Sequence, residues 1–376
     1  MMTPILQSDR AFYVPRPDRL YHQFRYRRER SNIEQRLVQD ILAEYGVQVR
    51  GNIEVQVGRS DSVIFETPDG KKMLKRYKET LIPAAVLHEH SILTYLAQIG
   101  FPAPRLARTI SGDTLLQKEG RCYAVFEFLE GYFQYHNYLL LPGQLRQFIT
   151  ASGKALGTLH STLQDFTPEG YHPNGFKSRT EGRWRELDWF DEKLEQCRQN
   201  LPRLQSRDGR VAGDMFSEHA GWVEATLHEL DERIDVAALP RVIIHGDYGP
   251  YNLFFKREAP TVILDFELAR LDWRLADLAM ALPAFANSRL GFSLQKMRCF
   301  LEGYRAGCPI DAEELRLLPA VWQFFVLRRV VFCWYRYCET PTARWLTEAQ
   351  QKLKLARWIG SRQRTLSSLL GSEQYG

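Results

Sequence analysis

The pattern of apolar and polar positions divides the chain into a strand-rich first third and a helical remainder. NIEVQVG alternates with a period of two, VIFE is short and β-branched, and KKMLKRY follows the turn residues Pro68-Asp69-Gly70. These features predict three strands over residues 52–77, with a hairpin at Asp69-Gly70. The stretch from Gly58 to Ser62 would form the tip of the first hairpin.

Two helices and two further strands are expected around these three. One helix is predicted over 31–46. A second is predicted over 82–98, where Pro83 suits the first turn. Strands are predicted over 105–110 and in CYAVFEFLEG. We therefore expect an arm and helix over residues 1–50, followed by a small antiparallel-sheet lobe over 51–128.

After Gly131 the apolar spacing becomes helical, which predicts a large helical lobe over 129–376. The amphipathic runs are 142–164, 180–200, 213–235, 293–306, 311–338 and 343–370. The most apolar long run, VWQFFVLRRVVFCWYRYC, is interrupted by three arginines and is predicted to be a core helix rather than a membrane span.

Composition and charge narrow the class of protein. The 376 residues are enough for two lobes, and 44% hydrophobic with 25% charged residues is ordinary for a globular chain. A net charge of +5 fits an anionic ligand without indicating nucleic acid. The six cysteines have no metal-ligand spacing, and the N-terminus lacks a signal-peptide core, so we expect reduced thiols, no membrane and a cytoplasmic protein.

Residues 10–36 are rich in arginine and aromatic residues. They could form an anion-binding or nucleic-acid patch. We favour an arm or helix with solvated guanidinium groups, because most charge runs are solvated faces.

The stretch HGDYGPYNLFFKREAPTVILDFE, residues 245–267, embeds two carboxylates and an amide among apolar residues. It follows a buried-type strand at 241–244 and predicts a hairpin with arms 253–255 and 262–264. If the register is symmetric, Leu253 faces Leu264. Asn252 and Asp265 then emerge together at one end of the hairpin.

Three oxygen-bearing side chains would thus converge on an apolar floor. Oxygen-only ligation of this kind suits Mg²⁺, which binds with substrate phosphates, and one remaining carboxylate near the metal can orient a hydroxyl and take its proton. Asn252 follows Asp247 by five residues and precedes Asp265 by 13, as in protein-kinase phosphoryl transfer. The alternative is that all three are polar loop residues that cap turns.

A lysine and a glutamate extend this pattern into the first lobe. Lys75 lies in the third predicted strand, where a lysine would contact the α- and β-phosphates. Glu89 lies within the apolar stripe that Ala85, Ile92, Leu96 and Ile99 form on the next helix. A carboxylate on an inward face needs a partner, and Lys75 is the natural one. Alternatively, both side chains are solvated at the edge of the stripe.

Other candidate residues are more weakly indicated. Backbone N–H groups at Gly58 and the hydroxyl of Ser60 could cover phosphates, and Glu127 and Leu129 fall at the crossing where main-chain groups would bind an adenine edge. Asp277 either braces the loop at 245–252 or caps the helix that it starts.

These motifs resemble the aminoglycoside phosphotransferase and choline kinase superfamily, including its homoserine-kinase-like and spore-coat-associated branches. The resemblance covers about residues 50–310. The motifs that carry it are VIIHGDYGPYNLFF, VILDFELARLDWRLADLAMAL, LKRY, HEHSILTYLAQIGFPAPRL, FEFLEG and ALGTLH.

The resemblance implies an α+β, bilobal protein-kinase-like fold and phosphorylation of a hydroxyl on a small molecule by ATP, or GTP, with Mg²⁺. Asp247 would be the catalytic base, Asn252 and Asp265 the metal ligands, and Lys75 and Glu89 an ion pair at the phosphates. His245 would support the loop. No Ala-Pro-Glu segment follows Glu267, which argues against a protein substrate.

Two questions stay open at this level. A catalytically silent, nucleotide-binding scaffold would carry the same motifs. The acceptor could be an amino sugar, an amino alcohol, a sugar or a hydroxy amino acid, and neither it nor the oligomeric state follows from the sequence. Candidate acceptor contacts are Trp184, Asp188, Trp189, Asp191, Trp322 and Trp334. The simpler interpretation of each is a core aromatic or a solvated acid.

Overall fold

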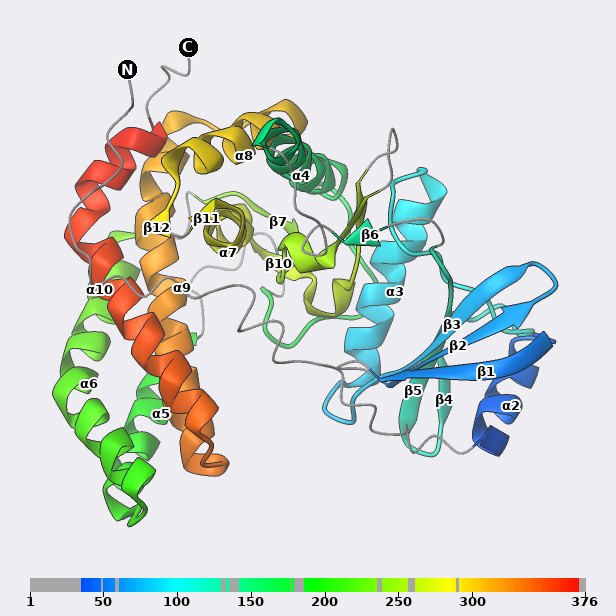
Figure 1. The fold of residues 1–376 in the computed structure, drawn as a ribbon, viewed down its shortest axis with the longest axis horizontal. Coiled ribbons are helices and arrows are strands. Elements are labelled where there is room, and N and C mark those ends of the chain that lie inside the picture. Colours follow the sequence, from blue (N-terminus) through cyan, green and yellow to red (C-terminus); the bar gives the residue numbers. More distant parts are fainter. Residues whose placement is uncertain are drawn as a thin grey trace.

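The computed structural model describes residues 35–48, 50–57, 61–129, 133–134, 142–176, 178, 186–234, 239–255, 261–288 and 291–371. A sheet-containing lobe and a larger helical lobe lie side by side, with short strands and the helix α3 between them (Figure 1). The first lobe holds the N-terminal elements, and the helices from α4 onward form the second.

The first lobe is built on a five-stranded antiparallel sheet with the order β1-β2-β3-β5-β4. Its strands are β1 (Arg50–Val57), β2 (Asp61–Thr67), β3 (Gly70–Arg76), β4 (Leu116–Lys118) and β5 (Arg121–Glu127).

The strand predicted at 105–110 is wrong. Only an isolated bridge between Leu106 and Phe126 forms there, and β4 is the edge strand instead. The chain leaves the sheet at this point because Thr109 and Asp113 close a turn, in which the Thr109 N–H donates to the Asp113 carbonyl at 2.7 Å.

Two helices cover opposite faces of this sheet. The helix α2 (Gln35–Glu44) packs Ile41 and Leu42 against Leu74 of β3, whereas α3 (Pro83–Gln98) belongs to the main core. Side chains alternate along a strand, so Lys75 and Tyr77 lie on the face that α3 covers. This alternation points the Lys75 side chain toward the helical lobe. The predicted start of the first helix, at residue 31, lies outside the described residues.

The second lobe consists of the helices that were predicted from the apolar spacing, together with α7. They are α4 (Pro142–Thr162), α5 (Glu186–Asn200), α6 (Arg207–Arg233), α7 (Arg274–Ala286), α8 (Leu294–Gly307), α9 (Ala312–Glu339) and α10 (Ala343–Gly371). Short 3₁₀ helices occur at η2 (Leu201–Arg203), η3 (Pro250–Asn252) and η4 (Phe266–Leu268). Ser206 caps α6 by accepting the Gly209 N–H at 2.9 Å.

The helix α9 is the centre of this lobe, and it packs against α5, α6, α7 and α10. It is long and apolar enough to cross a membrane, but 72% of its most apolar window is buried inside the protein. Trp334 is fully buried, and the Arg328 guanidinium lies 4.6 Å from the Phe325 ring centroid. This burial agrees with the predicted core helix.

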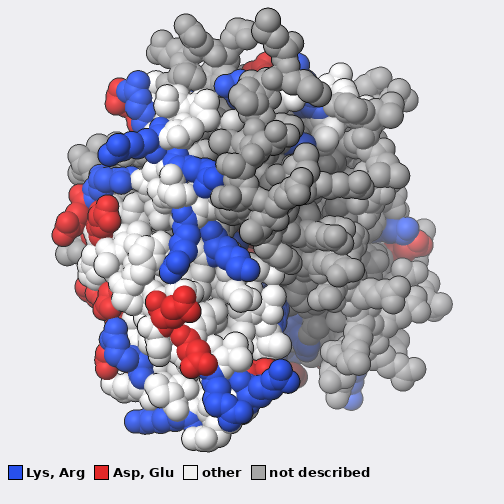
Figure 2. All heavy atoms as spheres, turned by 60° about the vertical axis from the view of Figure 1, so that its left-hand side comes forward, with Lys and Arg blue, Asp and Glu red and all other residues white. Residues whose placement is uncertain are grey.

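The outer face of the helical lobe, which includes α6 and α10, carries side chains of both charges (Figure 2). Several arginines there lie against tryptophan rings. Arg357 is 5.0 Å from Trp222, and Arg362 is 5.4 Å from Trp358. These guanidinium groups therefore cover apolar surface as well as carrying charge.

Short strands between the lobes hold the stretch 245–267. β7 (Arg241–Ile244) pairs with β10 (Arg270–Trp273), and a second sheet has the order β6-β8-β9. The members of that sheet are β6 (Phe133–Gln134), β8 (Leu253–Phe255) and β9 (Val262–Ile263), and the remaining strands are β11 (Asn287–Ser288) and β12 (Gly291–Phe292).

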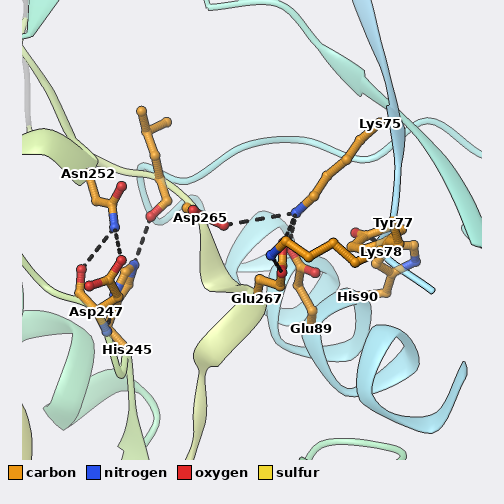
Figure 3. A network of polar contacts seen from close by, with 11 residues as sticks. Lys75, Tyr77, Lys78, Glu89, His90, His245, Asp247, Asn252, Asp265 and Glu267 are labelled. Atoms are coloured by element: carbon orange, nitrogen blue, oxygen red, sulfur yellow. Dashed lines mark hydrogen bonds and ion pairs between the residues drawn. The ribbon is translucent and has the colours of Figure 1, made fainter. Parts of the chain in front are cut away.

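The predicted symmetric register of the hairpin is wrong by one residue. Leu253 pairs with Ile263, and the Leu264 N–H donates to the Asn252 carbonyl at 2.9 Å. Asp265 adopts a left-handed conformation (φ 60°, ψ 69°), which ends the extended arm before Asp265 can pair. Asp265 consequently turns out of the hairpin, between Asn252 and Lys75 (Figure 3).

Candidate active site

The second residue of the loop that follows β7 is a glycine that the packing requires. Gly246 has φ +80°, in the left-handed region that glycine tolerates best. A Cβ at this position would lie 2.2 Å from the Leu268 carbonyl oxygen. Any side chain at 246 would therefore push the loop away from η4.

Asp277, in the first turn of α7, braces this loop. Its carboxylate is fully buried and accepts the N–H groups of His245 and Gly246 at 2.6 and 2.8 Å. His160 Nε2 lies 3.0 Å from the same carboxylate. Burial raises the pKa of Asp277, but the hydrogen bond from His160 and the other contacts of the carboxylate, including the Gly246 N–H, together hold that pKa below its usual value. Of the two alternatives left by the sequence, bracing is the observed one.

His245 connects the two halves of the stretch. Its Nδ1 accepts the Asp247 N–H at 3.2 Å, so its Nε2 donates to the Leu264 carbonyl at 2.7 Å. The ring is fully buried. It fixes the backbone before Asp247 relative to the backbone before Asp265, which is a supporting position rather than one beside a substrate.

The Asp247 carboxylate is held by two neighbours in the same loop. Asn252 Nδ2 donates to the Asp247 carbonyl at 2.8 Å and to Oδ2 at 3.2 Å (Figure 3). The Tyr251 hydroxyl donates to Oδ1 at 2.8 Å. The spacing predicted the proximity of Asn252, but it gave no sign of Tyr251, whose aromatic side chain folds back along its own turn.

Lys75 lies among three carboxylates. Its Nζ is 3.4 Å from Glu89 Oε1, 3.3 Å from Glu267 Oε2 and 3.9 Å from Asp265 Oδ1 (Figure 3). Glu89 is 3% exposed, so the expected partner of this inward carboxylate is the one observed. Lys78, which no sequence motif indicated, adds a 2.6 Å ion pair with Glu267 Oε1.

Burial and charge oppose each other in this cluster. Burial lowers the pKa of Lys75, but the carboxylates of Glu89, Asp265 and Glu267 raise it by more. The net effect is a raised pKa, so the ammonium form is stabilised. Burial raises the pKa of Glu89, and Lys75 offsets only part of that rise. For Glu267 the two lysines outweigh burial and lower the pKa. Of these carboxylates, Asp265 is the most exposed, at 52% of its side chain.

A series of buried polar side chains supports the turn of α3 that carries Glu89. The Tyr77 hydroxyl lies 3.0 Å from His90 Nε2, and His90 Nδ1 lies 2.9 Å from Thr114 Oγ1. His90 follows Glu89 directly on α3, so this series fixes the turn of helix that presents the carboxylate. Ile99, expected in the same apolar stripe, follows the helix end and is 49% exposed.

The nucleotide contacts predicted nearer the sheet edge are only partly described. Glu127 is the last residue of β5 and is exposed, and Leu129 lies two residues beyond it, where the chain leaves the sheet. Gly58 and Ser60 lie outside the described residues.

Of the four tryptophans proposed for an acceptor site, Trp322 and Trp334 are core residues, and Trp189 is half-buried against Tyr335. Trp334 packs on Phe216, and Trp322 packs on Phe292. Asp188 is exposed, and Asp191 Oδ1 lies 3.0 Å from His228 Nε2. Trp184 lies outside the described residues. The simpler interpretation therefore holds for Trp322 and Trp334.

The described residues contain no group of three or more His, Cys, Asp or Glu side chains arranged to hold a metal ion. The donor set at Asn252 and Asp265 nevertheless fits a cation that takes most of its ligands elsewhere. Asn252 Nδ2 is used by Asp247, which leaves the amide oxygen as a ligand, and Asp265 is half exposed. Two protein oxygens completed by phosphates and water suit Mg²⁺.

A small sheet lobe that presents a buried lysine–glutamate pair, facing a helical lobe with an Asp–Asn loop, defines a kinase-like phosphotransferase. Residues 53–317 match the model of the phosphotransferase enzyme family, and the chain belongs to that family. It is a small-molecule phosphotransferase, as the sequence predicted, and its α+β, protein-kinase-like fold is confirmed.

Several sequence relatives of this chain are homoserine kinases. The enzyme of Acidiphilium cryptum is 26% identical over 278 residues, which cover 74% of this chain and 78% of that protein. The enzyme of Hyphomonas neptunium is 27% identical over 283 residues, which cover 70% and 76%.

Solved structures share the fold at lower identity. An amicoumacin kinase in complex with AMP-PNP and Ca²⁺ is 14% identical, with a TM-score of 0.60 and coverage of 88% of this chain and 94% of that one. A microcompartment-associated aminopropanol kinase is 16% identical, with a TM-score of 0.58 and coverage of 90% and 100%. Membership of this family implies a nucleotide as phosphate donor.

Proposed function

We propose that this protein transfers the γ-phosphoryl group of ATP to the hydroxyl of a small amino-bearing molecule, with L-homoserine as the first acceptor to test. One observation carries the choice of acceptor. Four sequence relatives that match 70–76% of this chain are homoserine kinases. GTP is the alternative donor.

In the proposed reaction, Asp247 is the base. The acceptor hydroxyl gives its proton to the Asp247 carboxylate, while its oxygen forms a bond to the γ-phosphorus. The bond from that phosphorus to the β–γ bridging oxygen breaks, and ADP leaves. Because the transfer is direct, positioning and charge neutralisation supply most of the rate enhancement.

Lys75, held by Glu89, would contact the nucleotide phosphates, and Gly58 and Ser60 would cover them. Glu127 and Leu129 would lie at the adenine edge. Asn252 and Asp265 would bind Mg²⁺, which neutralises phosphate charge when bound. The excess of negative charge in this cluster supports the binding of a cation. Glu89, Asp265 and Glu267 outnumber the ammonium groups of Lys75 and Lys78 that pair with them.

The division into an arm and helix (1–50), a nucleotide lobe (51–128) and a helical lobe with the acceptor site (129–376) stays our proposal, as does a cytoplasmic location. The six cysteines, all within the described residues and none in a disulfide, fit a reducing compartment.

A panel assay tests the function. ATP consumption with Mg²⁺ is measured against L-homoserine, choline, ethanolamine, aminoglycosides and simple sugars, with Asp247→Asn in parallel. We expect turnover that depends on an amino-bearing acceptor and is lost in the variant. Transfer to a sugar without an amino group would overturn the acceptor class. Binding of ATP·Mg without transfer to any member would favour the silent scaffold.

A further inference from the structure

The turn after Asp247 folds Tyr251 back over Gly249. A Cβ at position 249 would lie 2.6 Å from Cε1 and 2.8 Å from Cζ of the Tyr251 ring. Gly249 itself has φ −165° and ψ 168°, an extended conformation that any residue adopts. A larger residue at 249 would therefore have to displace the Tyr251 ring, whereas the backbone there would accept it.

This placement brings the phenol to the proposed base. The Tyr251 hydroxyl donates to Asp247 Oδ1 at 2.8 Å, while Asn252 Nδ2 donates to Oδ2 at 3.2 Å. Each carboxylate oxygen thus has its own donor. The two hydrogen bonds fix the rotation of the carboxylate about the Cβ–Cγ bond. A carboxylate oxygen has two lone pairs, so a substrate hydroxyl can still bind beside the phenol.

The turn that carries Tyr251 is anchored independently of Asp247. The Tyr248 ring is buried, and its hydroxyl donates to the Ser152 carbonyl of α4 at 2.6 Å. The Asn252 N–H donates to the Gly249 carbonyl at 2.9 Å and closes the turn. The phenol is consequently presented to Asp247 from a fixed support.

We propose that Tyr251 is a positioning residue for phosphoryl transfer, which holds the Asp247 carboxylate in the orientation that meets the acceptor hydroxyl. Gly249 is the partner that makes room for its ring. The inference rests on the proposed function, because it takes Asp247 as the base. A hydrogen bond to an ionised carboxylate is among the stronger ones in proteins, so its loss has a measurable effect.

Tyr251→Phe removes only the hydroxyl. With L-homoserine as probe, and with water as acceptor in ATP hydrolysis, kcat should fall about 10-fold, the order expected for one hydrogen bond to a charged group. The KM for Mg·ATP and for the probe should stay unchanged. An unchanged kcat would overturn the proposal. So would a raised acceptor KM at constant kcat, because the phenol would then bind the acceptor instead.

A crystal structure of Tyr251→Phe gives a readout that needs no acceptor. We expect the Asp247 carboxylate to rotate or to occupy two conformers, while Asn252 and Tyr248 keep their positions. A single, unchanged Asp247 conformer would show that Asn252 alone sets the orientation, and that outcome would overturn the proposal.

A double-mutant cycle tests the pairing of Gly249 with the ring. Gly249→Ala should lower kcat in the wild-type background, since the added methyl displaces Tyr251, and should have no further effect in Tyr251→Ala. Equal losses in both backgrounds would contradict it. Asp247→Asn separates the two levels: if that variant keeps its turnover, the proposed base is wrong. If it is inactive and Tyr251→Phe is not, only the positioning role fails.

Discussion

Asp277 accepts the backbone N–H of Gly246 at 2.8 Å, and so ties the loop of the proposed base to the first turn of α7. The same carboxylate accepts the His245 N–H and is fully buried. The loop that carries the proposed base is thereby held to α7 by a buried carboxylate.

Replacing Asp277 with Asn should therefore affect stability and activity together. The amide keeps one acceptor but turns an N–H₂ group toward a backbone donor, so we expect a loss of about 3 kcal/mol in the free energy of unfolding. Denaturant titration measures this loss. The matched control is Asp214→Asn, an exposed position on α6, which should stay within about 0.5 kcal/mol of wild type. Equal stability of the two variants would contradict the bracing role.

Asp247→Asn should remove turnover and leave nucleotide binding intact. A neutral amide cannot take the acceptor proton but keeps the size of the side chain, so we expect kcat to fall roughly 10²–10⁴-fold. Binding of a fluorescent ATP analogue with Mg²⁺ is the control. Loss of binding in this variant would mean that Asp247 holds the nucleotide or the metal ion.

The sequence predicted most of the architecture because periodicity records burial directly. The strands β1 to β3 and the helices α3 to α6 and α8 to α10 follow from apolar spacing and turn residues. The error at 105–110 arose because a short segment can make a single bridge to a sheet and then leave it. The register of the β8–β9 hairpin depended on the left-handed conformation of Asp265, which spacing does not report.

The site was predictable where chemistry imposes a spacing. Asp247 and Asn252 lie five residues apart in one loop, and Glu89 stands out as a carboxylate in an apolar stripe. Tyr251 and Lys78 were not predictable, because their contacts depend on where a side chain folds back or reaches across lobes. Lys78 and Glu267 are 189 positions apart in the sequence, and no motif indicates that they pair.

Lys75→Met should destabilise the protein more than a surface lysine substitution does. It leaves Glu89, which is 3% exposed, without its cation, and breaking a buried pair in this way costs about 3–5 kcal/mol. Adding Glu89→Gln should recover part of that loss, since the unpaired charge is then removed as well. Lys71→Met is the control, because Lys71 pairs with Glu66 at 3.9 Å on the surface and such pairs contribute about 0–1 kcal/mol. No recovery in the double variant would mean that Glu89 does not depend on Lys75.

The buried His90 should make stability depend on pH. Burial, assisted by the charge of Lys75, lowers the pKa of His90 from 6.5 to about 3. Tyr77, Thr114 and the edge of Phe126 surround the ring, and no carboxylate is in contact with it among the described residues. Between these two pH values the unfolded chain binds the proton more tightly than the folded one.

The stability that neutral His90 contributes is therefore complete above pH 6.5 and is lost as the pH falls toward 3. At pH 5 the loss should reach about 2 kcal/mol, at about 1.4 kcal/mol for each pH unit below the unfolded pKa. Denaturant titrations of wild type and His90→Asn between pH 7.5 and 5 isolate the loss of stability that is due to His90, because every other titrating group is common to both proteins. The asparagine variant starts less stable but should lose about 2 kcal/mol less over this range, and parallel curves would show that His90 is protonated in the folded protein.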